Sequence, residues 1–235
     1  MADGTILVLG GTGPAGICLL RELLYRHHPT IVYARNPSKI PRELASNPLL
    51  EVIEGDMNDR DALSPAIARC SVILSLLGPQ LSNTNIGPSL FADIYRSSVF
   101  PLMRQHGTRR IFAMGTITIQ RPEDHWTLLR FMTVFFLRLF FGVMYQNIIN
   151  LADAFDNDAK DLDWTVFRIA AIPGKSDEAS WKKDREDEDI FAGAIGEKGW
   201  TSSTNRSLLA RWLADAAEGK WDKFARMMPA LSHRG

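Results

Sequence analysis

Three glycines near the start of the chain have the spacing of a loop that binds nucleotide phosphates. Gly10, Gly13 and Gly16 lie between the apolar run 5–9 and a segment with helical apolar spacing. Gly10 permits a tight turn with positive φ, Gly13 lets a pyrophosphate approach the backbone, and Gly16 allows close packing of helix and strand. The phosphates would meet the free N–H groups at the helix N-terminus. We therefore expect contacts from Gly10, Thr12, Gly13, Pro14, Ala15 and Gly16.

The end of the next apolar run indicates which nucleotide binds. An enzyme that prefers NAD typically has Asp or Glu about 20 residues beyond the loop, to hold the ribose 2′-hydroxyl. Here the sequence has Arg35, followed by Lys39. A guanidinium can form two hydrogen bonds to a 2′-phosphate, and a lysine adds charge. The sequence predicts NADP, and the alternatives are a solvated Arg35 and a glycine turn without a ligand.

Two further strand ends would complete the nucleotide site. Asp56 can accept a hydrogen bond from the adenine amine while Met57 packs on the ring, although Asp56 or Asn58 could instead cap the next helix. The predicted turn 76–79 would flank the ribose and the nicotinamide. The residues expected there are Leu76, Leu77 and Gly78.

The elements that must position these residues alternate in the order expected of a doubly wound sheet. Short, mostly apolar runs are typical of strands buried on both faces, and helical patterns separate them. The predicted strands are 5–9, 30–34, 50–54, 72–76, 110–114, 164–168 and 199–201. Ser203 or Thr204 would then cap a last helix through Glu218, ended by Gly219.

The fold class expected is therefore α/β, a Rossmann-type parallel sheet with a small C-terminal cap on the substrate side. A length of 235 residues, 46% of them hydrophobic, suits one large domain over 1–235. Segments 115–160 and 170–200 would form the substrate side.

Composition argues against several other classes of protein. Lys and Arg together number 27, as do Asp and Glu, so the formal charge of zero does not favour a nucleic-acid binder. Cys18 and Cys70 lack metal-ligand spacing and are interpreted as small buried hydrophobes, so no metal site is predicted. Because the glycine loop lies close to residue 1 with no signal peptide before it, a cytoplasmic location is expected.

The stretch 125–152 contains no Asp or Glu and is rich in phenylalanine. Arg130 and Arg138 interrupt its apolar run before it reaches the length of a membrane span, so no integral span is predicted. The stretch is interpreted either as a long core helix or helix pair, or as an apolar wall over a substrate cleft, possibly a lid or dimer face. Peripheral membrane contact was the weaker alternative. The chain would be a monomer or a homodimer.

These motifs together resemble the atypical, NmrA-like short-chain dehydrogenases/reductases, including the NAD(P)H-binding proteins similar to biliverdin-IXβ/flavin reductase. The resemblance covers 5–174 and is carried by 8–16, 34–39, 54–56 and 162–168. It implies NADP(H) binding, and it implies that 169–174, with Ala170 and Ala171, passes near the nicotinamide amide. Many relatives have proline directly after this arginine, where this chain has Ile169. The tail 202–221 resembles fungal members, which often serve secondary metabolism.

The acid–base pair of ordinary short-chain dehydrogenases is missing. That pair is Tyr-x-x-x-Lys on one helix, whereas Tyr145 is followed four residues later by Ile149. Candidate hydrogen-bond or proton donors are Thr116, Thr118, His125 and Tyr145, each with a structural role as the alternative.

The predicted function is an NADPH-dependent reductase of a small aromatic or conjugated compound, such as a quinone, flavin, enone or polyketide-like molecule. In this reaction the cofactor carries the difficult chemistry. The alternatives are an NADP(H)-binding cyclase or isomerase without net redox, and a redox-sensing regulator.

Overall fold

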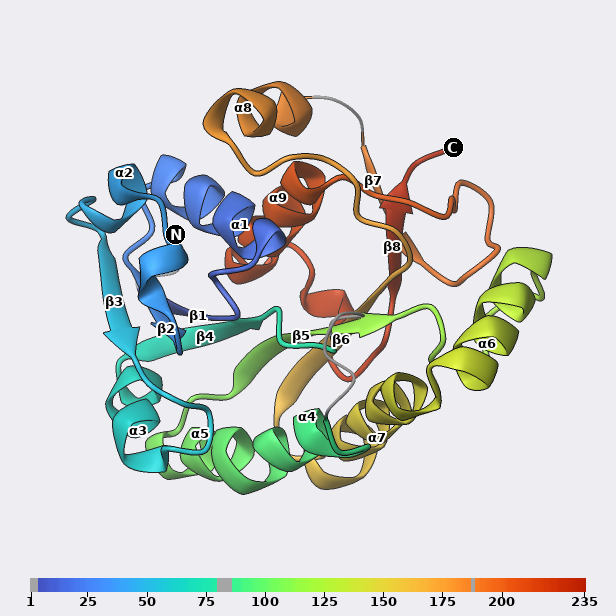
Figure 1. Ribbon diagram of the computed structural model, residues 1–235, viewed down its shortest axis with the longest axis horizontal. Coiled ribbons are helices and arrows are strands. Elements are labelled where there is room, and N and C mark those ends of the chain that lie inside the picture. Colours follow the sequence, from blue (N-terminus) through green and yellow to red (C-terminus); the bar gives the residue numbers. More distant parts are fainter. Residues whose placement is uncertain (1–3, 80–85, 187–188) are drawn as a thin grey trace.

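A single twisted sheet runs through the computed structural model, which describes residues 4–79, 86–186 and 189–235 (Figure 1). Its eight described strands have the order β3-β2-β1-β4-β5-β6-β8-β7. All neighbouring pairs are parallel except β7 with β8, which is antiparallel. The strands are β1 Thr5–Leu9, β2 Thr30–Ala34, β3 Leu50–Glu54, β4 Cys70–Ser75, β5 Arg110–Thr116, β6 Asp163–Ile169, β7 Ile190–Gly193 and β8 Ala230–His233.

The expected α/β fold is confirmed, and the first three strands have the predicted bounds. All five residues of β2 are buried, as an apolar run covered on both faces requires. Strands β2 and β3 extend the sheet on one side of β1, and β4, β5 and β6 extend it on the other, so the strand order reverses between β1 and β4. Such a switch point leaves a crevice at the carboxyl ends of the strands, where ligands of this fold bind.

Helices cover both faces of the sheet (Figure 1). Helices α1, α8 and α9 lie on one face, and α3, α4, α5 and α7 lie on the other. A π-helical turn, Tyr95–Val99, joins α4 to α5. The helices are α1 Pro14–Tyr25, α2 Arg42–Ala45, α3 Arg60–Ala68, α4 Leu90–Ile94, α5 Phe100–His106, α6 Leu128–Phe140, α7 Gly142–Asp158, α8 Glu178–Glu186 and α9 Arg206–Ala217.

The C-terminal part differs from the sequence prediction. The segment 199–201 is not a strand, and β7 and β8 complete the sheet instead. Helix α9 is capped by Asn205, whose side chain accepts a hydrogen bond from the Leu208 N–H at 2.6 Å, and not by Ser203 or Thr204. A short run such as β8 gives little periodicity, and it becomes a strand by pairing with β6 and β7.

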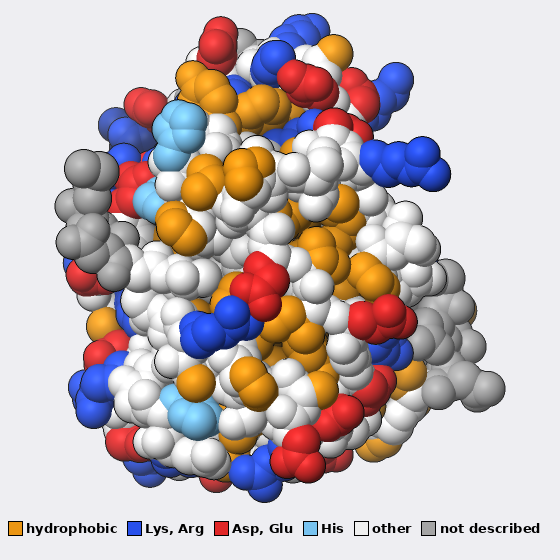
Figure 2. Space-filling view, turned by 90° about the vertical axis from the view of Figure 1, so that its left-hand side faces the viewer, with side chains coloured by type: hydrophobic (Ala, Val, Ile, Leu, Met, Phe, Trp, Pro, Cys, Tyr) orange, Lys and Arg blue, Asp and Glu red, His pale blue; other side chains and the backbone are white. Residues whose placement is uncertain are grey.

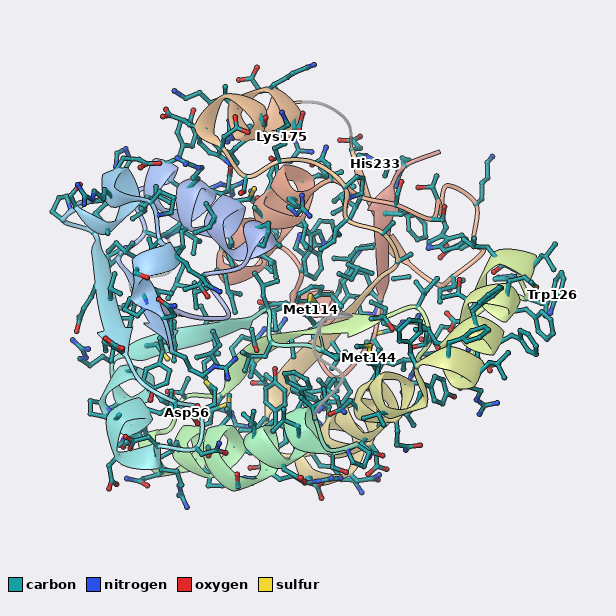
Figure 3. All side chains as sticks on the ribbon, viewed as in Figure 1. Asp56, Met114, Trp126, Met144, Lys175 and His233 are labelled. Carbon is teal, nitrogen blue, oxygen red and sulfur yellow. The ribbon has the colours of Figure 1, made fainter. Side chains whose placement is uncertain are left out.

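The interpretation of 125–152 as core helices is correct for α7 and wrong for α6. Helix α7 buries seven residues against the sheet, whereas α6 buries none. Helix α6 lies beyond the sheet edge at the right of Figure 1, and Figure 3 shows Trp126 at this end, far from Asp56. The opposite end, which carries β3 and α3, mixes charged and hydrophobic side chains (Figure 2).

No single helix in the described residues is long and apolar enough to cross a membrane. Helices α6 and α7 pass that test of length and composition only when taken together, and the chain bends by 117° between them.

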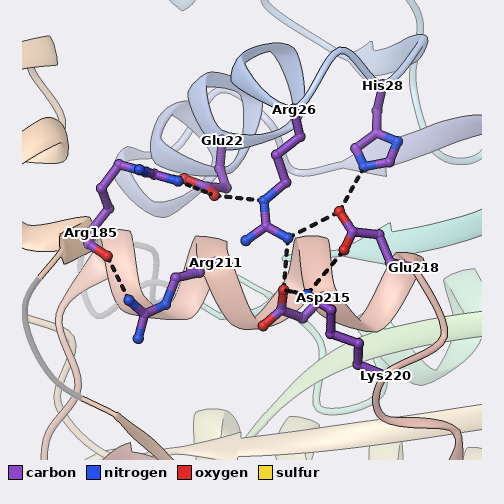
Figure 4. Close-up of polar contacts among 8 residues, drawn as sticks. All are labelled: Glu22, Arg26, His28, Arg185, Arg211, Asp215, Glu218 and Lys220. Atoms are coloured by element: carbon purple, nitrogen blue, oxygen red, sulfur yellow. Dashed lines mark hydrogen bonds and ion pairs between the residues drawn. The ribbon is translucent and has the colours of Figure 1, made fainter. Parts of the chain in front are cut away.

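A buried carboxylate ties α1 to the helices beside it (Figure 4). Glu22 is fully buried and accepts hydrogen bonds from Arg26 at 2.8 Å and from Arg185 of α8 at 2.9 Å. Arg26 in turn donates to Asp215 and Glu218 at the end of α9. Burial alone would raise the pKa of Glu22, but the hydrogen bonds from Arg185 and Arg26 outweigh it and hold that pKa below its ordinary value of 4.5.

We expect Glu22→Gln to lower the free energy of unfolding at neutral pH by about 1–3 kcal/mol, because the buried side chain loses its charge-assisted hydrogen bonds from Arg26 and Arg185, while Arg26 keeps Asp215 and Glu218. Since the folded pKa of Glu22 is depressed, its contribution is complete above pH 4.5 and is lost as the pH falls further. The difference between wild type and variant in urea unfolding should therefore shrink with acidification. As a control, Glu51→Gln removes the exposed pair with Arg69 and should cost less than about 1 kcal/mol.

Candidate functional site

A cavity of about 440 Å³ lies at the carboxyl ends of the first strands. It brings together most residues that the sequence assigned to the nucleotide, although they come from four separate loops. Those that line it are Gly10, Thr12, Gly13, Arg35, Lys39, Asp56, Met57, Leu76, Leu77 and Gly78. Of the remaining assignments, Pro14, Ala15 and Gly16 form the first turn of α1, next to this loop.

The three glycines of the loop meet different constraints. Gly10 has φ +80°, and a Cβ there would lie 3.0 Å from the Leu76 backbone. A Cβ on Gly16 would lie 2.5 Å from the Gly10 carbonyl oxygen, so strand and helix could not pack as they do. At Gly13 the nearest atom would be 3.8 Å away, so the protein itself leaves that space open. The open space and the N-cap at Gly13, which has no side-chain cap, fit a phosphate group.

The positive charge at the end of β2 is available to a ligand. Arg35 and Lys39 are exposed at the cavity wall, and neither forms an ion pair with a carboxylate in the described part of the chain. Lys39 ends the short 3-10 helix Pro37–Lys39, and it lines the same cavity as Arg35.

The end of β3 serves partly as a turn. Asp56 Oδ1 accepts hydrogen bonds from both the backbone N–H and the side-chain amide of Asn58, each at 2.9 Å. The cap of α3 is Asp59, whose carboxylate accepts from the Ala62 N–H at 3.0 Å. Met57 is buried. Asp56 thus has a structural role in the loop, and its Oδ2 has no hydrogen bond among the described residues.

The loop after β5 is held by a buried ion pair. Arg168 and Asp124 are almost completely buried, and they form two parallel hydrogen bonds of 2.5 and 2.8 Å. The Asp124 carboxylate also accepts from the backbone N–H groups of Ile195 and Arg121. Burial would raise the pKa of Asp124, but the hydrogen bonds from Arg168 and these N–H groups outweigh it and lower that pKa.

A second cavity of about 850 Å³ lies between α6, α7 and this loop. Two of the four predicted donors line it, Thr118 and Tyr145. Thr116 Oγ1 lies 2.6 Å from Thr118 Oγ1, so the two hydroxyls share a hydrogen bond. The rest of the wall combines apolar and aromatic side chains with charged ones. The first group includes Trp126, Phe131, Val134, Phe135, Leu139 and Ile149, and the charged group is Arg121, Arg130, Arg138, Asp153 and Asp156.

The remaining predicted site residues, His125, Ala170 and Ala171, line neither cavity. The His125 side chain is exposed, and its backbone N–H donates to the Ile195 carbonyl at 2.8 Å. Ala170 and Ala171 are exposed. The Ala171 N–H donates to the Ser202 carbonyl at 3.3 Å, and the Ala171 carbonyl accepts from the Thr204 N–H at 3.0 Å. Whether they contact the cofactor remains a prediction.

A match to a protein-family model identifies the family of this chain. Residues 10–219 match the model described as NAD(P)H-binding. The chain belongs to this NAD(P)H-binding family. The family resemblance found in the sequence is thereby confirmed. That the cavity at the carboxyl ends of β1–β4 holds the nucleotide stays a prediction.

Solved structures with the same fold include an NADP complex. This NAD(P)H-binding protein superposes with a TM-score of 0.74 on a short-chain dehydrogenase/reductase from Veillonella parvula in complex with NADP, at 17% identity over 99% of this chain and 95% of that one. ChuY, an anaerobilin reductase from Escherichia coli O157:H7, gives a TM-score of 0.68 at 14% identity over 97% of each chain.

Curated relatives match shorter segments. The oxidoreductase claK of Passalora fulva is 29% identical over 107 residues, which cover 44% of this chain and 38% of that protein. A 3β-hydroxysteroid dehydrogenase/Δ5→4-isomerase of Mycobacterium tuberculosis is 39% identical over 64 residues, covering 27% of this chain and 16% of that protein. The matched segments thus span well under half of these relatives.

Sequence reasoning missed one wall of the nucleotide cavity. Leu90, Phe91 and Ile94 of α4 line it. Their apolar spacing at i, i+1 and i+4 indicates one helix face, but the sequence analysis assigned no helix to this segment. Which cavity that face meets depends on packing between α4 and α7, where Asn147 donates to the Gly87 carbonyl at 2.6 Å.

The glycine geometry gives a matched pair of variants. Gly13→Ala should lower the free energy of unfolding by no more than about 1 kcal/mol, because its Cβ meets open space and the only loss is that alanine is a weaker N-cap residue than glycine. It should weaken NADPH binding at least tenfold, since that space belongs to the phosphates. Gly16→Ala should instead destabilise the fold by about 1–3 kcal/mol through overpacking. Urea unfolding and cofactor fluorescence titration measure the two effects, and full affinity in Gly13→Ala would contradict the assignment.

Proposed function

We propose that this NAD(P)H-binding protein is an NADPH-dependent reductase of a small aromatic or conjugated compound. The observation that carries the cofactor preference is the pair of unpaired cations, Arg35 and Lys39, at the end of β2. A ribose 2′-phosphate is the group that distinguishes NADP from NAD, and it needs such charge. An acidic residue that would bind the 2′-hydroxyl of NAD is absent from Arg35–Lys39.

The acceptor is proposed to bind in the cavity beside α6 and α7. A volume of about 850 Å³ is within the usual range for ligand sites, and the aromatic side chains in the wall, Trp126, Phe131 and Phe135, suit a flat molecule of several rings that also carries polar groups. Thr118 and Tyr145 supply the polar contacts expected of such a site. The residues that line this cavity fall within the segment 115–160 assigned to the substrate side.

The chemistry that NADPH supplies when bound is a hydride, which provides the two electrons of the reduction. This chain has Ile149, and not a lysine, four residues after Tyr145. Its residues therefore position an electron-poor acceptor and donate hydrogen bonds to the oxygen that gains electron density, and solvent or a hydroxyl supplies the proton. Quinones, enones and flavins can accept a hydride without a strong acid beside them, whereas an unactivated ketone requires a stronger acid.

Arg35→Ala should raise the dissociation constant for NADPH about 10- to 100-fold and change that for NADH less than about twofold. The reason is that charge-assisted hydrogen bonds contribute about 1.5–3 kcal/mol each. Isothermal titration measures both constants. Arg60→Ala is the control, because Arg60 is an exposed cation in the first turn of α3, outside the cavity wall. Equal losses for the two nucleotides would refute the 2′-phosphate contact.

Turnover should appear as NADPH oxidation at 340 nm with a panel of quinones, enones and flavins. Tyr145→Phe and Thr118→Val should each lower kcat by about tenfold or more for the best acceptor, since each removes a hydrogen bond to a developing negative charge. Thr133→Val is the matched control, because the Thr133 hydroxyl bonds only the Leu129 carbonyl of its own helix.

Other outcomes of the same panel identify the alternatives. Conversion of a substrate that continues without any nicotinamide nucleotide would indicate a cyclase or isomerase. No turnover with any acceptor, together with binding that distinguishes NADP⁺ from NADPH, would indicate a redox sensor.

A further inference from the structure

Helix α6 turns two arginines toward the second cavity. Arg130 and Arg138 both line it, and so does Val134, halfway between them. The three residues recur every four positions, so they share one face of the helix. The positive charge of α6 therefore faces the space in which the acceptor is proposed to bind.

The carboxylates in the same wall are already paired. Asp153 accepts a hydrogen bond from Arg96 at 2.8 Å, and Asp156 accepts one from Arg121 at 2.7 Å. Asp124, which precedes α6 in the chain, is held by its buried ion pair at the end of β6. These acids are thus not available as counter-charges for the arginines of α6.

Neither arginine of α6 forms an ion pair with a carboxylate in the part of the chain that the structure describes. Arg130 donates to two uncharged acceptors, the Ile117 carbonyl at 2.9 Å and the Gln120 side chain at 3.3 Å. The Arg138 guanidinium lies over the Tyr145 ring, 4.8 Å from its centre, and has no hydrogen bond to another described residue. Because arginine remains protonated at neutral pH, the wall keeps two positive charges that no carboxylate neutralises.

The setting of these charges favours an anionic ligand. Arg130 is partly buried, and burial lowers the pKa of its guanidinium below its ordinary value, although the charge of Asp124 acts in the opposite direction. A cation that is partly removed from water attracts an anion more strongly than one in open solvent. The phosphates of the cofactor are predicted to bind elsewhere, because neither arginine lines the nucleotide cavity. The negative charge must therefore come from the ligand of the second cavity.

We propose that the ligand of this cavity, the acceptor of the proposed reaction, carries an ionised acidic group that binds Arg138. A planar guanidinium matches a carboxylate through two parallel hydrogen bonds, and the N–H groups of Arg138 are free to make them. Arg130 adds to the positive potential of the same wall. The inference rests on the proposed function and narrows it, from any conjugated compound to an aromatic or conjugated acid.

A pair of probes that cannot be reduced tests the binding. Naphthalene-2-carboxylate and naphthalene-2-carboxamide have nearly the same shape and differ in charge. Isothermal titration in the presence of NADP⁺ should give a dissociation constant at least about tenfold lower for the carboxylate, since its hydrogen bonds to a guanidinium are charge-assisted.

A second pair of probes adds the reaction. A naphthoquinone carries either the carboxylate or the carboxamide on its second ring, away from the quinone. The quinone gains a hydride from NADPH and a proton from solvent, which gives the hydroquinone and NADP⁺. The value of kcat/KM should favour the carboxylate by about tenfold or more, for the same reason as in binding.

Variants of Arg138 identify the residue that reads the charge. Arg138→Gln should reduce the preference for the carboxylate to less than about twofold, and Arg138→Lys should retain about threefold, because a lysine keeps the charge without the planar fork. The fold should survive, since Arg138 is exposed and has no hydrogen bond to lose among the described residues, and unchanged NADPH affinity checks this. Arg60→Gln is the control, because it removes the same charge from the first turn of α3, outside the cavity wall, and should keep the full preference.

The outcomes separate this inference from the proposed function. Carboxylate and carboxamide that bind equally to wild type, or a preference that Arg138→Gln leaves intact, would overturn the inference. If both quinones were then reduced at equal rates, the reductase would stand without the acidic group. Tighter binding of the carboxylate that depends on Arg138, without turnover of either quinone, would support the acidic ligand and refute the reductase.

Discussion

The buried pair between Arg168 and Asp124 is the constraint on which the acceptor side of the molecule depends. Two charges removed from water are costly unless each is paired and hydrogen-bonded. Asp124 accepts four hydrogen bonds, and Arg168 also donates to the Ile119 carbonyl at 2.9 Å. These bonds join the end of β6, the loop after β5 and the chain after β7, so α6 starts from a fixed point. The loop that carries Thr116 and Thr118 is thus positioned by an ion pair rather than by sheet hydrogen bonds alone.

Unpaired cations are the more informative charges in a chain whose formal charge is zero. Most described arginines form an ion pair with a carboxylate, as Arg26 does with Glu22 and Asp215. Their charge is therefore neutralised within the fold. Arg35 and Lys39 differ because they line an open cavity and form no ion pair among the described residues. On physical grounds, a folded protein keeps cations in such a position only where the cost is small or a ligand supplies the anion.

The sequence predicted best what local chemistry determines. The glycine loop, Arg35 and the continuous apolar strands each depend on neighbours within a few residues, and the first three strands have the predicted bounds. What it could not predict depends on distant partners. Strand β8 forms because β6 and β7 pair with it, Asp124 lies 44 residues from Arg168, and the composition of α6 is equally compatible with burial and exposure. Only packing shows that α7 occupies the core and leaves α6 outside.

The missing tyrosine–lysine pair follows from how α7 is used. In ordinary short-chain dehydrogenases one face of this helix presents both groups to the substrate. Here Met144, Asn147 and Ile148 are buried in the body, and Asn147 holds the chain before α4 through the Gly87 carbonyl. Ile149, in the position of the lysine, lines the second cavity. Because α7 has no lysine there, the proposed acceptor is one electron-poor enough to take a hydride with only hydrogen bonds from the protein. This is why the proposed substrates are conjugated, and why a simple alcohol–ketone pair is a poor fit for this site.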